Sequence, residues 1–182
     1  MPNASPNIQP VSLEAIEDPE LRALIARCER LGVPDSLFPR ILAHVPSYAK
    51  ALLPALLMSH TEGNVDHRLK EIIRVRLAGI AGDPYFGALR SKQAKADGLT
   101  EDRIAAASGK LDDGKFNAAE KLALQYAGQM YLDPDKNDAA FYTRLKEHYS
   151  EAQIMELGAF IAFHYGMQVF MRTVDARPMA GA

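Results

Sequence analysis

A histidine, a glutamate and an arginine are spaced so that they could take part in acid–base chemistry. Glu71 follows His67 by four residues and precedes Arg74 by three, and side chains at these spacings share one face of a helix. Two interpretations stay open. Either the three residues form a solvated salt-bridge face, or Glu71 serves a pocket in which a carboxylate moves a proton.

Arg90 is a permanent cation four residues after Phe86, which is one turn in a helix. A guanidinium cannot act as a general base, but it can bind a substrate carboxylate with two parallel hydrogen bonds. It could instead pair with Glu71, which would lower the pKa of that carboxyl group and make it a weaker base. The first arrangement favours catalysis on a carboxylate, and the second favours a structural ion pair.

Asp83 and His164 each have a structural and a chemical interpretation. Asp83 precedes Pro84, a pair typical of the N-cap and first position of a helix; alternatively, Asp83 faces a pocket and binds a cation or moves a proton. His164 lies among apolar residues at helical spacing. It is either a core histidine with one hydrogen bond or a pocket histidine suited to acid–base work at neutral pH.

Cys28 is the only cysteine of the chain. A single thiol excludes an internal disulfide, a cysteine-based metal cage and any two-thiol redox mechanism within the chain. Cys28 also lies on an apolar helical stripe, where we expect a thiol to be buried and inert. The histidines show no ligand-like spacing and there is no phosphate-binding loop, so we expect no metal and no cofactor.

Composition and charge are those of one ordinary folded domain. The chain has 182 residues, of which 48% are hydrophobic and 24% charged, and its net charge of -2 offers no field that would attract nucleic acid. The first residues do not resemble a signal peptide, and no uncharged apolar run approaches the ~20 residues that span a bilayer. We therefore expect a cytoplasmic protein with no nucleic-acid or membrane partner.

The expected elements are helices separated by short turns. Caps, glycine stops and apolar stripes predict helices over 18–31, 36–45, 47–60, 66–81, 83–98, 100–108, 117–131, 137–149 and 150–174, with Pro54 bending or splitting the third. No window shows the alternation of a strand. We therefore predict an all-α fold with a single domain over residues 11–182, preceded by a flexible arm over residues 1–10.

The segment from His67 to Ile104 resembles the carboxymuconolactone decarboxylase and alkylhydroperoxidase D-like family. Members of that family have a helix that carries Arg-Glu followed by apolar residues, then a short turn, and then a Cys-x-x-Cys-x-x-x-His motif that opens the next helix. An alanine and a Gly-Leu pair follow the histidine at fixed distances. The resemblance places the family's characteristic residues on Glu71, Tyr85, Ala94, Gly98 and Leu99. It implies a compact multi-helix, homo-oligomeric domain with a family core over about residues 48–131.

All three reactive positions of the family motif are replaced in this chain. Asp83 stands in place of the first cysteine, Phe86 in place of the second and Arg90 in place of the histidine. A thiol peroxidase needs one thiolate to attack the peroxide and a second thiol to resolve the product, and Cys28 cannot do both. The motif is degenerate, and we expect no thiol-dependent hydroperoxide reduction.

Three functions stay open. The first is a non-redox acid–base enzyme, either a carboxy-lyase or a lactone-type enzyme, acting on a small carboxylate or lactone. Its catalytic candidates are Glu71, Tyr85, Arg90 and His164, and its substrate-binding candidates are Asp83, Phe86 and Arg90. The second is a catalytically silent oligomeric binding or scaffold protein, and the third is an antioxidant protein with alkylhydroperoxidase-like activity. The apolar 154–171 segment favours self-association into a dimer, trimer or hexamer.

Overall fold

The structure is a computed structural model that describes residues 6–108, 111 and 115–178. Its helices are α1 (Pro19–Leu31), α2 (Leu37–Leu42), α3 (Pro46–Thr61), α4 (His67–Ala81), α5 (Pro84–Ala88), α6 (Lys92–Ala96), α7 (Glu101–Ser108), α8 (Ala118–Leu132), α9 (Ala139–Lys146) and α10 (Glu151–Thr173). A 3-10 turn, η1 (Pro134–Lys136), joins α8 to α9. No strand occurs in the described ranges, and the all-α prediction is confirmed.

Local sequence signals set the ends of the longer helices. The Asp66 carboxylate accepts hydrogen bonds from two amides in the first turn of α4. Asn117 and Ser150 start α8 and α10 in capping boxes. Gly32 and Gly82 end α1 and α4 with φ angles of 80° and 64°, a left-handed conformation that glycine adopts without strain. The boundaries of these helices therefore follow from the sequence.

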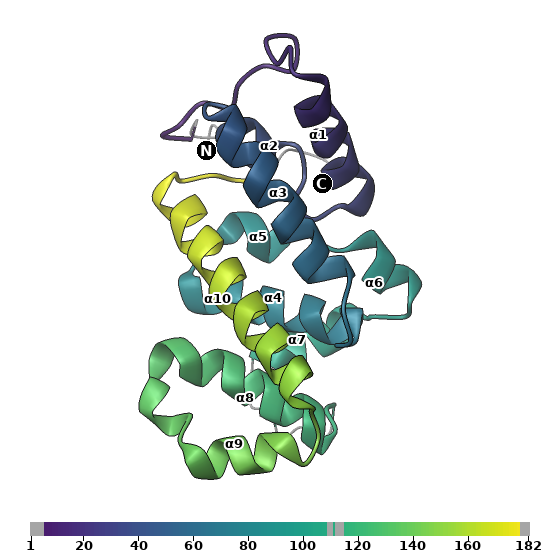
Figure 1. Cartoon of the computed structure of the whole chain (residues 1–182), viewed down its shortest axis with the longest axis vertical. Coiled ribbons are helices and arrows are strands. Elements are labelled where there is room, and N and C mark those ends of the chain that lie inside the picture. Colours follow the sequence, from purple (N-terminus) through teal and green to yellow (C-terminus); the bar gives the residue numbers. More distant parts are fainter. Residues whose placement is uncertain (1–5, 109–110, 112–114, 179–182) are drawn as a thin grey trace.

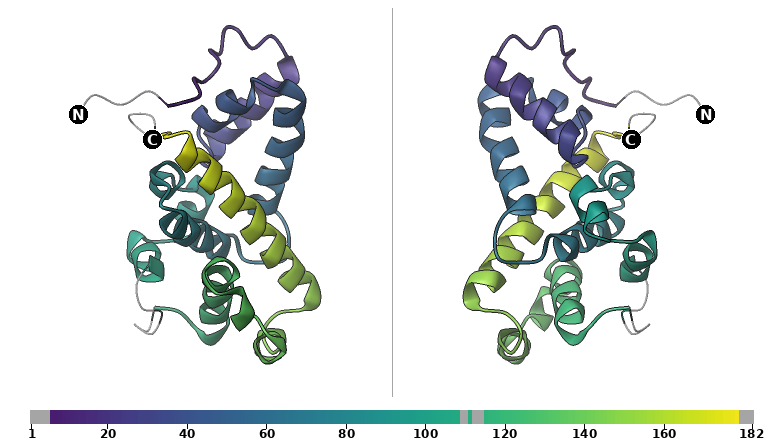
Figure 2. Two further views of the ribbon diagram at one scale, coloured as in Figure 1. Left: turned by 90° about the vertical axis from the view of Figure 1, so that its left-hand side faces the viewer. Right: turned by 90° about the vertical axis from the view of Figure 1, so that its right-hand side faces the viewer.

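Two helices, α4 and α10, lie against each other in the middle of the molecule (Figure 1). At one end, α1, α2, α3 and α5 enclose a cluster of buried apolar residues together with the C-terminal part of α10. At the other end, α4, α8, α9 and the N-terminal part of α10 enclose a second cluster. Figure 2 shows α10 running between the two ends. Polar residues on α4 are therefore placed where the two clusters meet.

The helix predicted over 83–98 is wrong in one respect, because the chain forms two short helices, α5 and α6, with a break at residues 89–91. The break has a physical cause on α4. Arg74 binds two backbone carbonyl oxygens of this segment, and Glu71 binds the amide of Ser91. These backbone groups would otherwise bond within one continuous helix.

The described part of the predicted arm, residues 6–10, contacts the folded domain. The Asn7 amide donates to Val174 O at 2.7 Å, and Asn7 Nδ2 donates to Thr173 O at 3.1 Å. These bonds place this segment beside the C-terminal end of α10. Residues 1–5 of the predicted arm lie outside the described residues.

By length and composition, α10 is apolar enough to cross a membrane, and it is the one helix of that kind among the described residues. It packs against α3, α4 and α5 inside the fold, as the core helix of a globular domain does, so its sequence is weak evidence for a membrane. α3 is likewise apolar and continues through Pro54, so the predicted split of this helix does not occur.

Candidate functional site

Glu71 lies on α4, and its side chain has almost no contact with solvent. Its carboxylate accepts hydrogen bonds from Arg74 Nε and Nη2, each at 2.8 Å, and from the Ser91 amide at 2.8 Å. His60 Nε2 lies 3.0 Å from Glu71 Oε2. The solvated salt-bridge face considered from the sequence is therefore wrong, because the ion pair is buried inside the fold.

Arg74 ties α4 to the segment that follows it. Its guanidinium donates to Phe86 O at 2.5 Å and to Leu89 O at 2.7 Å, in addition to the two bonds to Glu71. The guanidinium therefore uses four of its five N–H donors inside the protein. We call Glu71 and Arg74 the α4 clamp, because together they hold the chain between α5 and α6.

Three histidines lie around the α4 clamp. His67 Nδ1 lies 2.7 Å from His60 O, and His67 Nε2 lies 2.8 Å from Ser91 Oγ. His164 Nε2 on α10 lies 3.3 Å from Ser59 Oγ. The ring centroids of His60 and His164 are 5.7 Å apart. His164 therefore has the hydrogen bond expected of a core histidine. It contacts the ring of His60, and His60 in turn lies next to Glu71 of the clamp.

Burial and ion pairing fix the charges of these groups at neutral pH. Burial alone would raise the pKa of Glu71, but the adjacent Arg74 guanidinium outweighs burial and holds that pKa well below its usual range. Burial lowers the pKa of His60 to about 4, and it lowers the pKa of His164 well below its usual range. At neutral pH the carboxylate is charged and both imidazoles are neutral, so Glu71 is not poised to accept a proton.

Asp83 caps α5. Its carboxylate accepts hydrogen bonds from Tyr85 N at 3.0 Å and from Phe86 N at 3.2 Å, and only 3% of the residue is exposed. Burial raises the pKa of Asp83 to about 6. The capping interpretation accounts for these contacts without any chemistry at this position.

Tyr85 and Phe86 are buried in the apolar cluster of α1, α2 and α3. The Tyr85 hydroxyl donates to Asp35 Oδ1 and accepts a hydrogen bond from Phe38 N at 3.2 Å. Burial and the Asp35 carboxylate raise the pKa of Tyr85 well above its usual range. The ring of Phe86 packs edge-on against Phe38, with the ring centroids 5.5 Å apart. Both side chains therefore contribute to the core on this side of the molecule.

Arg90 pairs with Glu101 and not with Glu71. Its Nε lies 3.0 Å from both Glu101 carboxylate oxygens, and its Nη1 donates to two nearby carbonyl oxygens at 2.7 and 2.8 Å. Because the helix ends before Arg90, Arg90 does not lie one helical turn after Phe86 on the same helix face, as the predicted continuous helix would place it. The partner of Glu71 is Arg74, and their spacing of three residues on α4 is the signal for this pairing.

Sequence reasoning missed two polar residues of this buried region. His60 reaches the clamp from α3, and no spacing along the chain marks it. Lys70 is fully buried and donates to Ser59 O at 2.9 Å, and it also contacts Glu62 O and the Glu156 carboxylate. These contacts join segments far apart in the sequence, so they appear only once the helices are packed.

Cys28 on α1 is fully buried, and burial raises the pKa of its thiol to about 12. The thiolate that attacks peroxides is therefore scarce at neutral pH. Across residues 6–108, 111 and 115–178, no group of three or more histidine, cysteine, aspartate or glutamate side chains is placed to hold a metal ion. This part of the chain thus offers neither a reactive thiol nor a cluster of metal ligands.

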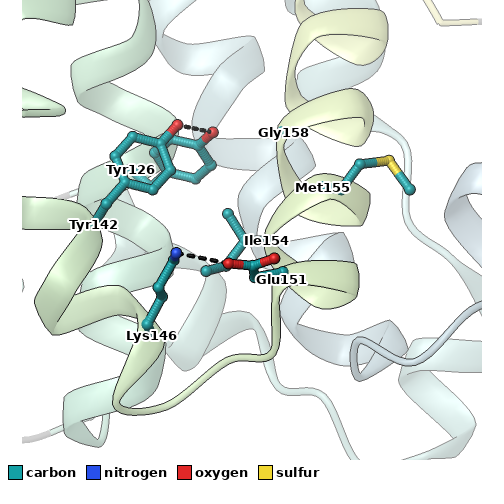
Figure 3. Close-up of a pocket in the computed structure, with 7 residues that line it drawn as sticks. All are labelled: Tyr126, Tyr142, Lys146, Glu151, Ile154, Met155 and Gly158. Atoms are coloured by element: carbon teal, nitrogen blue, oxygen red, sulfur yellow. Dashed lines mark hydrogen bonds and ion pairs between the residues drawn. The ribbon is translucent and has the colours of Figure 1, made fainter. Parts of the chain in front are cut away.

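A surface groove of about 310 Å³ lies between α8, α9 and α10, and none of the predicted site residues lines it (Figure 3). Tyr126 and Tyr142 line it with their hydroxyls 3.0 Å apart, and Lys146 pairs with Glu151 at 2.7 Å. Gly158 on α10 faces the tyrosines, since a Cβ atom there would lie 3.0 Å from the Tyr126 hydroxyl. A glycine at this position therefore leaves room for the tyrosine pair.

Known proteins share both the sequence pattern and the fold of this chain. The model of the carboxymuconolactone decarboxylase family matches residues 46–129, from the start of α3 into α8. The uncharacterized protein YdfG of Bacillus subtilis (strain 168) is 26% identical over 97 residues, which are 53% of this chain and 66% of YdfG. The match thus spans slightly less than two thirds of that relative.

Solved structures resemble the whole arrangement of helices. A variant of the debrominase Bmp8, in complex with 2,3,4-tribromopyrrole, is similar with a TM-score of 0.81 at 20% identity, covering 95% of this chain and 91% of Bmp8. The alkylhydroperoxidase AhpD core of an uncharacterized peroxidase-related protein from Ralstonia eutropha JMP134 has a TM-score of 0.74 at 19% identity, covering 97% and 95% of the two chains. At these identities the likeness shows an AhpD-like helical fold.

Proposed function

Because this chain belongs to the carboxymuconolactone decarboxylase and alkylhydroperoxidase D-like family, we propose that it is a catalytically silent member that acts as an oligomeric binding or scaffold protein. In this proposal, the glutamate that supports proton transfer in the family has become part of the α4 clamp, and thiol peroxidase chemistry is lost. This is the second of the three functions that the sequence leaves open.

The observation that carries the proposal is the saturated Glu71 carboxylate. A general base must come within about 2.6–3.2 Å of the proton that it abstracts. Glu71 already accepts three hydrogen bonds from protein donors and is fully buried. Separating Glu71 from Arg74 would leave a buried charge without its partner, which costs about 3–5 kcal/mol. A carboxylate held in this way supports a structural role.

The other catalytic candidates are also engaged by protein groups. Tyr85 is hydrogen-bonded to Asp35, Arg90 pairs with Glu101, and His164 contacts a serine of α3. Each of these side chains is accounted for by packing or by an ion pair. Their contacts add support to a silent site, because these polar groups are directed at protein partners.

Self-association would give such a protein a role, and α10 carries a surface that suits it. An exposed, mostly small and apolar stripe follows α10 at spacings of three and four residues: Met155, Ala159, Ala162, Gly166 and Val169. Met155 is 67% exposed, and Met58 on the adjacent α3 is 54% exposed. Small residues let a second helix approach closely, and the methionines would then lose their contact with water. This surface supports a homo-oligomer assembled through α10.

Steady-state assays test whether the protein is silent. The purified protein is incubated with an alkyl hydroperoxide and a dithiol, with a small carboxylated lactone, and with 2,3,4-tribromopyrrole and a thiol. We expect no turnover above that of the Glu71→Gln and Cys28→Ser variants. Turnover that disappears in Glu71→Gln, with the helical circular dichroism unchanged, would overturn the proposal in favour of an acid–base enzyme. Turnover that disappears in Cys28→Ser would overturn it in favour of a peroxidase.

An acid–base enzyme is the second candidate, and His60 is the observation that favours it. Among the described residues, His60 Nε2 is buried and forms no well-aligned hydrogen bond, although Glu71 Oε2 lies 3.0 Å away. A histidine beside a carboxylate is an arrangement that transfers protons in many enzymes. If this candidate is correct, His60→Gln abolishes turnover of the lactone while the exposed His148→Gln leaves it unchanged.

A further inference from the structure

Arg76 lies on α4 two residues after Arg74, and its guanidinium lies beside α8. One of its five N–H donors binds Ala107 O. In the described part of the chain, Arg76 Nε is buried without a hydrogen-bond partner, and the bond to Ala107 O is the one contact of its guanidinium with a protein acceptor. Burial lowers the pKa of Arg76. The cation is therefore only partly satisfied by the protein.

Two other arginines in the described part of this fold, unlike Arg76, are paired with a carboxylate. Arg74 pairs with Glu71, and Arg103 pairs with Glu120 at 2.7 Å. A half-buried cation without a counter-charge loses hydration and gains no Coulomb attraction in return. An anion that approached Arg76 would supply the attraction that is missing.

The Arg76 guanidinium lines a cavity of about 260 Å³ between α4, α8 and η1. Gly128 forms part of the α8 wall, and a Cβ atom there would lie 3.2 Å from Arg76 Nη2. Gln129 also lines the cavity, and its Oε1 is buried without a partner among the described residues. The cavity opens to solvent, and its volume lies near the lower end of the ~300–1,000 Å³ of small-molecule sites, so its size suits a ligand of few atoms.

We propose that Arg76 and this cavity, which we call the Arg76 site, bind a small organic carboxylate. The planar guanidinium offers parallel donors that match the two oxygens of a carboxylate. The side-chain amide of Gln129 can add a further donor, since its oxygen and nitrogen exchange places by a rotation of the amide. The inference rests on the proposed function, because it names what a silent member of the family would bind.

The charges around the cavity select a monoanion. Lys136 lies at the rim, but it is paired with Asp133 at 2.8 Å, so Arg76 is the cation left for a ligand in this described region. A phosphate dianion would meet one available cation and the Asp133 carboxylate, which also lines the cavity, and this combination disfavours it. Leu132 also lines the cavity and is 69% exposed, so it can cover an apolar group on the ligand. A carboxylate with one apolar substituent fits both features.

Isothermal titration calorimetry with benzoate tests the Arg76 site, and benzamide serves as the uncharged control ligand. We expect benzoate to bind saturably in the millimolar range or tighter, and benzamide to bind at least tenfold more weakly. Arg76→Gln should weaken benzoate binding at least tenfold. Arg27→Gln, which changes an arginine on α1 at the other end of the molecule, should leave the affinity unchanged (Figure 1).

Gly128→Ala keeps the charge and crowds the guanidinium, so it should also weaken benzoate binding. Because alanine favours a helix interior over glycine, such a loss would not reflect unfolding of α8. The inference is overturned if benzoate does not saturate the protein, or if Arg76→Gln binds it as tightly as the parent. It is also overturned if Arg76→Gln lowers the oligomeric mass and benzoate does not bind, since a carboxylate of a second copy would then occupy Arg76. None of these binding results depends on turnover. Failure of the Arg76 site can therefore be distinguished from failure of the proposed function, which the turnover assays test.

Discussion

Arg74 binds both carboxylate oxygens of Glu71 from three residues further along α4, through Nε and Nη2 at 2.8 Å each. The same guanidinium holds the carbonyl oxygens of Phe86 and Leu89. Glu71, on which the resemblance places the family's glutamate, is thereby held together with Arg74 against the segment between α5 and α6. Arg74 supplies the partner that a carboxylate charge needs when it is held inside the core.

Removing the charge of Glu71 should strongly destabilise the protein. Glu71→Gln leaves the buried Arg74 cation without its counter-charge, and we expect the free energy of unfolding to fall by about 3–5 kcal/mol. Urea denaturation followed by circular dichroism measures this loss. The control is Glu101→Gln, since the Glu101 side chain is 60% exposed where it pairs with Arg90. That exposed pair should contribute about 0–1 kcal/mol. Equal losses in the two variants would show that the α4 clamp is not a buried ion pair.

The pH dependence of stability should reveal His60. Its pKa is about 4 in the folded protein, below the value of about 6.5 in an unfolded chain. Its contribution to stability is therefore fully present above pH ~6.5 and is lost as the pH falls toward 4, by about 3 kcal/mol. Compared with the parent, His60→Gln should become relatively more stable over this range. His148→Gln, at an exposed position, should follow the parent. Parallel curves for the parent and His60→Gln would contradict the prediction.

Asp83 should give a pH dependence of the opposite sign. Burial raises its pKa to about 6, above the ordinary value of 3.8, so the folded protein takes up this proton first as the pH falls. The parent therefore gains stability relative to Asp83→Asn between pH 6 and 3.8, while asparagine keeps the cap of α5. Urea denaturation at several pH values measures the difference between the two proteins. A constant difference would show that the Asp83 carboxyl group titrates normally.

Helix boundaries were predictable wherever the signal is local. Asp66, Asn117 and Ser150 cap helices with their own first-turn amides, and Gly32 and Gly82 end helices through their own backbone conformation. The break between α5 and α6 was not predictable in this way. Its cause is the α4 clamp, whose side chains bind backbone groups 12 to 20 residues further along the chain.

The sequence shows the spacing of part of the polar network around Glu71, but it does not show which residues pair. The spacing of His67, Glu71 and Arg74 is visible in the sequence, and the structure places all three in one hydrogen-bonded network, with Glu71 and Arg74 buried and His67 half-buried. Arg90 was considered as a partner of Glu71 because a continuous helix was assumed, and the break directs it to Glu101 instead. Burial of a charged pair depends on what packs over it, and in this fold the residues from α3 and α10 do so.

Substitution by alanine should have different effects on stability at two glycines of α10, Gly158 and Gly166. A Cβ atom at Gly158 would lie 3.0 Å from the Tyr126 hydroxyl, whereas a Cβ at Gly166 would meet nothing within 4 Å. Gly166→Ala should stabilise the protein by about 0.5–1 kcal/mol, because alanine is the better helix former. Gly158→Ala should lose this gain, and Tyr126→Phe should restore part of it in the double variant. Thermal unfolding of dilute protein compares them, and equal stabilisation by both alanines would refute the contact.

The exposed stripe on α10 should control self-association. Ala162 lies in the middle of this stripe, between Ala159 and Gly166, and a glutamate there would place a charge where a second helix is proposed to pack. Multi-angle light scattering after gel filtration should give the parent a multiple of the 20.0 kDa chain mass and should give Ala162→Glu a mass nearer 20.0 kDa. Ala140→Glu, at an exposed position on α9, should keep the mass of the parent. A monomeric parent, or an Ala162→Glu variant that assembles as the parent does, would show that this face of α10 is not the interface.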